Sequence, residues 1–234
     1  MPELKPLSAR SAILSLMLGW PRGMTARELA RAGDYFGIAP STVRVALTRA
    51  VATGELERDG STYQLGERLL ARRRRQDEHA AVVAWDRTWE MAVVVTSGRP
   101  SGERAALRTE LTAARLAELR EGVWMRPANL SRTLPHADAS ALRTFRATPE
   151  QDPAALAAGL WDLGSWADEA AGAIDLLGST TEPAERLAVA AHLVRHLAAD
   201  PLLPPELWPD GWPAPQARAA YAGYQQELRA LGAW

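Results

Sequence analysis

The residues with the most informative chemistry lie on one face of a short helix predicted at positions 41–51. Apolar side chains recur there at helical spacing, which predicts a buried stripe of Val43, Ala46, Leu47, Ala50 and Val51. The opposite face carries Thr42, Arg44, Val45, Thr48 and Arg49. Arginine can donate two parallel hydrogen bonds to guanine or phosphate, and threonine can bond phosphate or contact a thymine methyl group. This face therefore predicts contact with the major groove of DNA.

The start of the same helix predicts a phosphate contact. Ser41 stands in the first turn, where backbone amide groups favour an anion. Pro40 fits the first helical position, which would make Ala39 the N-cap. Ser41 is the alternative N-cap, because serine caps helices better than alanine.

A small hairpin is predicted directly after this helix. Asp59-Gly60 is a strong turn signal between Leu56 and the alternating residues that end at Leu65. The hairpin carries Arg58, which we expect to contact the DNA backbone or minor groove. In the alternative interpretation the hairpin only completes the core of its module.

Two more helices are predicted upstream, at 8–19 and 25–37. Ser8 is a plausible N-cap for the first, and Thr25 with Glu28 has the spacing of a capping box at the start of the second. Helix, helix, short turn, helix and hairpin is the order of a winged helix-turn-helix. Double-stranded DNA is its expected partner. The alternative is a winged helix that contacts protein and has a solvated outer face.

Charge is divided unevenly along the chain of 234 residues, whose net charge is −1. Residues 1–75 hold 13 Lys and Arg against 7 Asp and Glu, and residues 76–234 hold 14 against 21. A net charge of +6 on the first third indicates that this part meets a polyanion. The basic run 72–75 is interpreted as a solvated linker, with DNA contact as the alternative.

Composition excludes several classes of protein. Hydrophobic residues make up 47% and charged residues 24% of the chain, which is ordinary for a globular protein. There is no cysteine, so disulfides, thiolate zinc sites and a cysteine nucleophile are excluded. No apolar run is long enough to span a bilayer, and the N-terminus lacks a signal-peptide cleavage site. We expect a cytoplasmic protein without membrane contact.

The rest of the chain predicts an α+β unit followed by helices. A strand at 89–97, a helix at 102–119 and strands at 122–127 and 141–148 form the α+β unit. From Pro153 the chain is predicted to be helical, with breaks at 179–185 and 200–216. The length of the chain suggests one or two domains, and three small ones are possible, with divisions at 1–75, 76–150 and 151–234.

Catalytic and metal-binding signals are weak. The sequence has no GxSxG, P-loop, GxGxxG or HExxH motif, so we expect no catalytic residue and no enzyme activity. His192 and His196 have the spacing of a metal-binding pair, with Asp200 one turn further on. A polar stripe on the helix is the preferred interpretation, and we predict no metal site.

Several segments together resemble the PaaX family of bacterial transcriptional regulators. They are ARSAILSLMLG (9–19), STVRVALTRAVATGELERDGSTYQLGERL (41–69), GVWMRP (122–127), LWDL (160–163) and LPPELWPDGWPAPQARAAY (203–221). The resemblance implies a winged helix, a central ferredoxin-like domain and an all-helical C-terminal domain. It also implies a homodimeric repressor of aromatic-acid catabolic genes that binds operator DNA. The implied effector is an acyl-CoA such as phenylacetyl-CoA, with no cofactor.

The resemblance also raises two further questions. Trp124 with Arg126, and Trp161 with Trp166, could line an acyl-CoA pocket, although packing is the preferred interpretation. The central domain is similar to small CRISPR-associated nucleases, which hold a metal with an Asp at the end of the first strand. Thr96 and Ser97 stand at that place and are poor ligands for a hard cation. A nuclease with a winged-helix targeting domain and a protein-interaction module are therefore the alternative functions.

Overall fold

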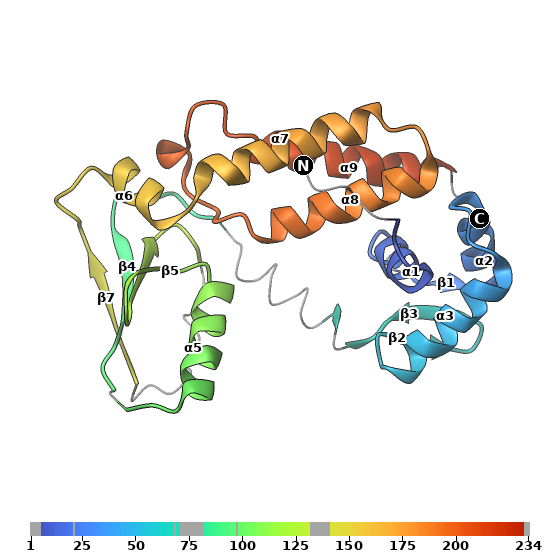
Figure 1. Ribbon diagram of the computed structural model, residues 1–234, viewed down its shortest axis with the longest axis horizontal. Coiled ribbons are helices and arrows are strands. Elements are labelled where there is room, and N and C mark those ends of the chain that lie inside the picture. Colours follow the sequence, from blue (N-terminus) through green and yellow to red (C-terminus); the bar gives the residue numbers. More distant parts are fainter. Residues whose placement is uncertain are drawn as a thin grey trace. The chain divides into compact units, whose positions relative to one another are not determined.

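The computed structural model describes residues 6–20, 22–67, 69–70, 82–96, 98–131 and 141–231. It is a mixed helix-and-sheet protein with a helical C-terminal region, as predicted (Figure 1). The chain forms two compact units. Unit 1 combines residues 1–74 with 165–200 and 213–234, and unit 2 combines residues 75–164 with 201–212. Because a packing unit can contain more than one domain, the division into three domains stays a prediction.

The N-terminal part of unit 1 has three helices and a small sheet. Its elements are α1 (Ala9–Met17), β1 (Met24–Thr25), α2 (Ala26–Tyr35), α3 (Pro40–Ala52), β2 (Leu56–Asp59) and β3 (Thr62–Leu65). The predicted caps are confirmed: the Ser8 hydroxyl accepts a hydrogen bond from the Ser11 amide, and Thr25 and Glu28 form the capping box. The predicted hairpin is also confirmed, since β2 and β3 pair antiparallel around the turn at 59–62.

Strand β1 (Met24–Thr25) was not predicted from the sequence. Met24 pairs with Tyr63 and Thr25 with Thr62, which gives an antiparallel sheet of order β1-β3-β2. Two residues are too few to show a strand period, so only the partner strand reveals β1. Gly23 precedes it with φ +77°, and a Cβ atom there would lie 2.5 Å from the Tyr63 carbonyl oxygen. Glycine is therefore needed at this position.

The C-terminal helices share one apolar core with the N-terminal elements. Helices α7 (Leu163–Ser179), α8 (Pro183–Ala198) and α9 (Ala214–Leu231) run beside one another (Figure 1). The buried face of α1 contacts both α3 and α8. This core contains Ile13, Leu16 and Met17 of α1 together with Leu193 of α8 and Leu228 of α9. The position of α3 is thus linked to the C-terminal helices through α1.

Unit 2 is built on a four-stranded antiparallel sheet of order β5-β6-β4-β7. Its elements are β4 (Trp89–Val94), α5 (Ser101–Ala113), β5 (Ala117–Arg120), β6 (Val123–Pro127), β7 (Leu142–Ala147) and α6 (Pro153–Leu160). Helix α5 covers one face of the sheet, where Leu107 and Leu111 pack against Ala92 and Trp124. The strands predicted at 89–97, 122–127 and 141–148 are confirmed with shorter bounds.

The helix predicted at 102–119 was too long. It ends at Ala113, and residues 117–120 form the edge strand β5 instead. Arg115 has φ +64° and turns the chain back toward β6. Leu119, the last residue of the predicted helix, lies on β5 and is 48% exposed. Residues 114–119 favour a helix by local propensity, and pairing with β6 overrides that preference.

Arg126 on β6 holds the proline-rich segment against the central sheet. Its side chain is fully buried and lies 3.5 Å from a Glu90 carboxylate oxygen. The guanidinium donates to five acceptors, with donor–acceptor distances of 2.8–3.2 Å. They are the carbonyl oxygens of Arg115, Pro127, Pro201 and Leu202 and the side-chain oxygen of Asn129. The segment that begins at Pro201 is therefore fixed to unit 2 by a charged hydrogen-bond network.

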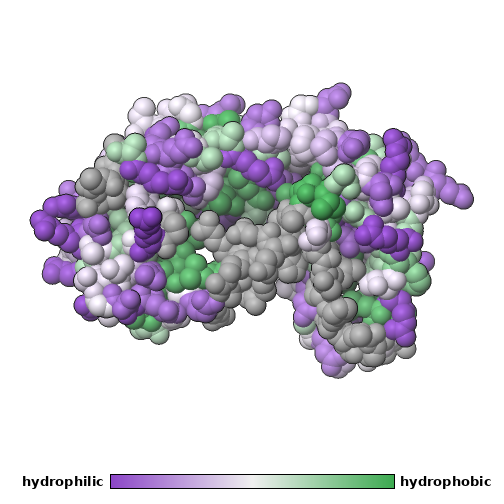
Figure 2. Space-filling model, turned by 180° about the vertical axis from the view of Figure 1, so that it is seen from behind, coloured by the Kyte–Doolittle hydropathy of each residue, from purple (hydrophilic) through white to green (hydrophobic). Residues whose placement is uncertain are grey.

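The described surface is mainly hydrophilic on the face that Figure 2 shows. On the face shown in Figure 2, hydrophilic side chains cover most of the described surface and apolar ones are exposed in small areas. Among the described residues, no helix is long and apolar enough to cross a membrane.

Replacing Arg126 with methionine should lower the free energy of unfolding by about 3–5 kcal/mol, because the buried acceptors lose their donors. Chemical denaturation of the full chain measures this change. The matched control is Arg120→Met, because Arg120 is exposed at the end of β5, and it should change the stability by less than about 0.5 kcal/mol. Equal losses in the two variants would contradict the role of the network.

Candidate nucleic-acid interface

Helix α3 presents a polar face to solvent over a buried stripe. Val43, Ala46, Leu47 and Ala50 are buried, as predicted, and pack in the core of unit 1. The side chains predicted to contact DNA are all exposed: Ser41, Thr42, Arg44, Val45, Thr48 and Arg49. Val51 was expected in the buried stripe but is 36% exposed, because it lies in the last turn of the helix. The outer face of α3 is thus available to a partner.

The start of α3 leaves backbone amides without a side-chain cap. Ala39 is the N-cap, Pro40 is the first helical residue, and the Ala39 side chain supplies no acceptor to the amides of the first turn. This decides between the two caps that the sequence left open. Ser41 and Thr42 follow with exposed side chains. Uncapped amides and the positive end of the helix dipole favour a phosphate at this point.

On the outer face of α3, Arg44 and Arg49 differ from Thr48 in the hydrogen bonds that their side chains form. Within the described residues, the guanidinium groups of Arg44 and Arg49 form neither ion pairs nor hydrogen bonds. The Thr48 hydroxyl donates to the Arg44 carbonyl oxygen at 3.0 Å. Thr48 therefore offers a partner its methyl group or an acceptor oxygen, and the arginines offer all their donors.

Arg58 is held against its own hairpin. Its Nε donates to the Gly60 carbonyl oxygen at 2.9 Å, and its guanidinium lies over the Tyr63 ring, 5.7 Å from the centroid. The side chain remains exposed. These contacts fix its direction before any ligand binds, and the outer guanidinium nitrogens are left for a phosphate.

Glu55, which directly precedes the hairpin, is paired with a basic residue of the same unit. Arg10 of α1 forms an ion pair with Glu55 at 2.6 Å, and this hydrogen bond holds the pKa of the Glu55 carboxyl group below its ordinary value. The side chains of Glu57 and Asp59 remain exposed on the hairpin. The basic run at 72–75 lies outside the described residues.

The histidine pair predicted on α8 faces one glutamate of α7. Glu169 lies 3.1 Å from His192 Nε2 and 3.6 Å from His196 Nδ1. The Trp166 ring stacks on His196, while Asp200 pairs with Arg218. Burial lowers the pKa of His192, partly offset by Glu169. In the described part of the chain, no three His, Asp or Glu residues are grouped so that they could hold a metal ion.

The tryptophan candidates contribute to packing, and Trp124 also lines a groove in unit 2. Trp124 and Arg126 are buried in unit 2, and Trp166 is buried in unit 1 against His196. Trp161 is partly buried at the end of α6, where its amide bonds the Ala157 carbonyl oxygen. Sequence reasoning missed two hollows, because each is formed where separate helices and strands pack together in the folded chain.

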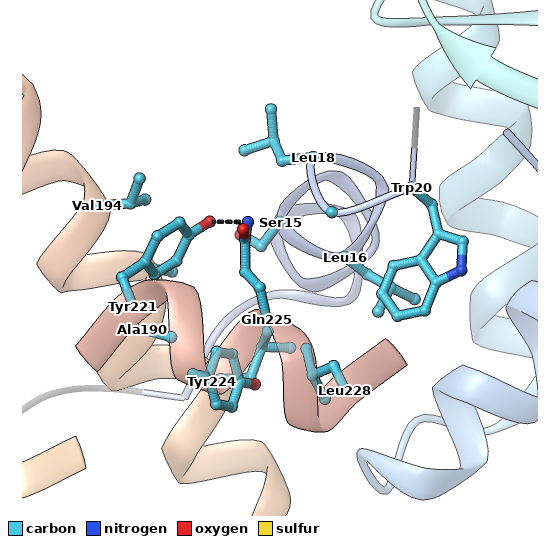
Figure 3. Close-up of a pocket in the computed structure, with 13 residues that line it drawn as sticks. Ser15, Leu16, Leu18, Trp20, Ala190, Val194, Tyr221, Tyr224, Gln225 and Leu228 are labelled. Atoms are coloured by element: carbon cyan, nitrogen blue, oxygen red, sulfur yellow. Dashed lines mark hydrogen bonds between the residues drawn. The ribbon is translucent and has the colours of Figure 1, made fainter. Parts of the chain in front are cut away.

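The first hollow is a narrow cavity between α1, α8 and α9 (Figure 3). Its volume is about 20 Å³, enough for about one water molecule. Gln225 Nε2 donates to the Tyr221 hydroxyl at 3.0 Å, the bond drawn in Figure 3. The buried Tyr224 hydroxyl has no hydrogen-bond partner among the described residues, and burial raises its pKa.

The second hollow is a groove of about 670 Å³ in unit 2, between α5 and the ends of β4 and β6. Three arginines line it, and Trp124 contributes to its floor. Its volume is within the range of about 300–1,000 Å³ that is usual for ligand sites.

Comparison with known proteins identifies the family. Residues 82–153 match the PaaX protein central Cas2-like domain, and residues 165–233 match the PaaX-like protein C-terminal domain. The chain belongs to the PaaX family. Members of the PaaX family are usually transcriptional regulators that bind DNA. The elements α1 to β3 lie outside both matched ranges.

A solved structure is similar over nearly the whole PaaX-family chain. It is the uncharacterized protein Rv0674 from Mycobacterium tuberculosis, with 44% sequence identity and a TM-score of 0.85. The alignment covers 95% of this chain and 96% of the other. A search of curated proteins found no match.

Tyr224→Phe should leave the free energy of unfolding unchanged or raise it by up to about 1 kcal/mol, because it removes a buried hydroxyl without a protein partner. Thermal or chemical denaturation measures the effect. The comparison variant Tyr221→Phe removes the acceptor of Gln225 and should lower the stability by about 1 kcal/mol. A clear loss in Tyr224→Phe would instead show that its hydroxyl has a bound partner.

Proposed function

We propose that this PaaX-family protein is a ligand-responsive repressor that binds double-stranded operator DNA with α3. The observation that carries the proposal is the exposed face of α3, with two arginines free of protein partners among the described residues. The elements α1 to β3 serve as a winged helix-turn-helix, with α3 as the recognition helix. The β5-β6-β4-β7 unit serves as the ferredoxin-like domain, and the C-terminal helices follow it.

Each exposed residue of α3 has a chemical role in the proposed complex. Arg44 and Arg49 donate to guanine or to phosphate, and Val45, which is 51% exposed, contacts a thymine methyl group. Ser41 and Thr42 bind a phosphate at the start of the helix. Thr48 makes an apolar contact through its methyl group, since its hydroxyl proton is already donated within the helix. Arg58 binds the DNA backbone.

The proposed repressor acts as a homodimer. Two recognition helices related by a two-fold axis would engage half-sites about 34–36 Å apart, or a multiple of that spacing. Two features of unit 2 support self-association: the edge strand β7 lacks a second neighbour in the described sheet, and Phe145 on it is 50% exposed. Apolar residues at an open sheet edge favour pairing with another chain.

An acyl-CoA such as phenylacetyl-CoA is proposed to release the DNA, without a cofactor. The protein has one form that binds the operator and another that does not. The effector releases the DNA only if its affinity is higher for the form that does not bind the operator. Genes for the degradation of aromatic acids are the proposed targets, as the family resemblance implies. The repressor would work in the cytoplasm.

We propose no enzymatic activity. A nuclease of the related type needs a carboxylate where β4 ends, and this chain has Val94 as the last strand residue and an exposed Thr96 beyond it. A hydroxyl is a poor ligand for Mg²⁺ compared with a carboxylate.

Arg44→Ala should weaken binding to the operator by about 1–3 kcal/mol and relax selectivity at one base pair. A mobility-shift assay with the DNA upstream of the protein's own gene, and with single-base variants of the site, measures both effects. Arg195→Ala is the matched control, because Arg195 is exposed on α8, away from the proposed interface, and it should bind like the wild type. If Arg44→Ala weakened all sequences equally, Arg44 would contact phosphate and would not read a base.

Binding to the operator should weaken steeply as salt is added, because each phosphate contact releases counterions. A protein with about 6–10 phosphate contacts loses about 10³–10⁵ in affinity between about 50 and 200 mM salt. For the dimer we expect a loss of affinity near the lower end of that range, measured by a fluorescence-anisotropy titration. A flat response to salt would argue against contact through α3 and for a protein-interaction module.

A further inference from the structure

We propose that the groove in unit 2 binds a phosphate-bearing organic anion with an apolar part, and that this is the effector site. The inference rests on the proposed function, because it assigns a place to the effector of the repressor. The groove lies between α5 and the strand ends of one compact unit, beside the helix labelled α5 in Figure 1. Its volume of about 670 Å³ suits a small organic molecule.

Positive charge is concentrated along the α5 side of the groove. Arg104 and Arg108 stand one turn apart on α5, and Arg99 precedes the helix. The Arg104 side chain is exposed and forms neither an ion pair nor a hydrogen bond within the described residues. Arg99 is largely buried, with its side chain 15% exposed, and lies 3.9 Å from Glu103. Arg104 is therefore the donor most readily available to an anion.

The first turn of α5 also favours binding of an anion. Pro100 is the N-cap and supplies no side-chain acceptor, so the amides of the first turn have no side-chain cap. Free amides and the helix dipole attract an anion at this end of the 13-residue helix. Arg99 and Arg104 flank this turn on both sides in the sequence.

The carboxylates beside the groove leave Arg104 without an acidic partner. Glu118 is held by the guanidinium of Arg108 at 2.7 Å and accepts from the Gly122 amide at 3.2 Å. Glu103 lies 3.9 Å from Arg99, and Glu121 is exposed on the turn between β5 and β6. Among the described residues, Arg104 is thus the groove arginine with no carboxylate beside it.

The floor of the groove is apolar. It contains Val94, Leu107 and Trp124, which belong to the core between α5 and the sheet. The Arg108 guanidinium lies over the Trp124 ring, 5.5 Å from the centroid. This cation–ring contact holds the Arg108 side chain against the apolar floor of the groove. Arginine donors beside an apolar floor match a molecule with an anionic end and an apolar body.

Isothermal titration calorimetry of the full chain tests the site with two probes, phenylacetyl-CoA and inorganic pyrophosphate. We expect both to bind the wild type, with pyrophosphate the weaker because it lacks an apolar part. Arg104→Ala should weaken each by about tenfold to a hundredfold, since a hydrogen bond to a charged group is lost. Arg104→Lys keeps the charge and should recover part of the affinity. Arg120→Ala, exposed on β5 but not in the groove, should bind like the wild type.

A mobility-shift assay separates this inference from the proposed function. Arg104→Ala should bind operator DNA like the wild type without ligand, and should need about tenfold more phenylacetyl-CoA for release. Full affinity of Arg104→Ala for both probes, or an equal loss in Arg120→Ala, would overturn the effector site and leave DNA binding by α3 intact. Absence of binding by both probes to the wild type would also overturn it. Binding of pyrophosphate alone would support the anion site and refute the proposed acyl-CoA effector.

Discussion

Burial of α1 in the core of unit 1 is the constraint on which the position of α3 depends. One helix contacts α3 and α8 together, and residues of α1, α3, α8 and α9 belong to a single apolar core. Protein interiors are closely packed and transmit small shifts, so α3 cannot move independently of the C-terminal helices without opening that core. The face proposed to read DNA is therefore a fixed surface of a larger unit.

Two polar arrangements complement this apolar core. In unit 2, the buried guanidinium of Arg126 joins β6 to the proline-rich segment, so residues distant in sequence form one body. On α3, by contrast, the arginines are exposed and have no protein partner in the described part of the chain. The same residue type thus serves stability where its donors are satisfied, and in the proposed function it serves recognition where they are left available. The arginines of the unit 2 groove lie between these extremes, since Arg99 and Arg108 face carboxylates and Arg104 does not.

Membership of the PaaX family and the geometry of α3 support the same proposed function by independent routes. The family matches cover the central and C-terminal ranges, whereas the proposed DNA-binding face lies in the part before them. The similar structure from Mycobacterium tuberculosis covers nearly the whole chain, including this N-terminal part. A regulator of this kind needs a DNA-reading surface and a ligand site, and the described residues offer a candidate for each in different units.

Local patterns in the sequence determined much of this protein. The capping box at Thr25, the apolar stripe of α3 and the turn after Asp59 each depend on a few neighbouring residues, so periodicity and turn chemistry predicted them. The exposure of Arg44 and Arg49 followed from the same stripe. Only the tertiary structure decided strand β1 and the acceptors of Arg126 on the proline-rich segment, whose partners lie far away in the chain. It also decided strand β5 and the groove beside α5, which depend on pairing and packing between successive elements. The physical reason is that burial and strand pairing act between separate segments of the chain, and they override local preference where the two conflict.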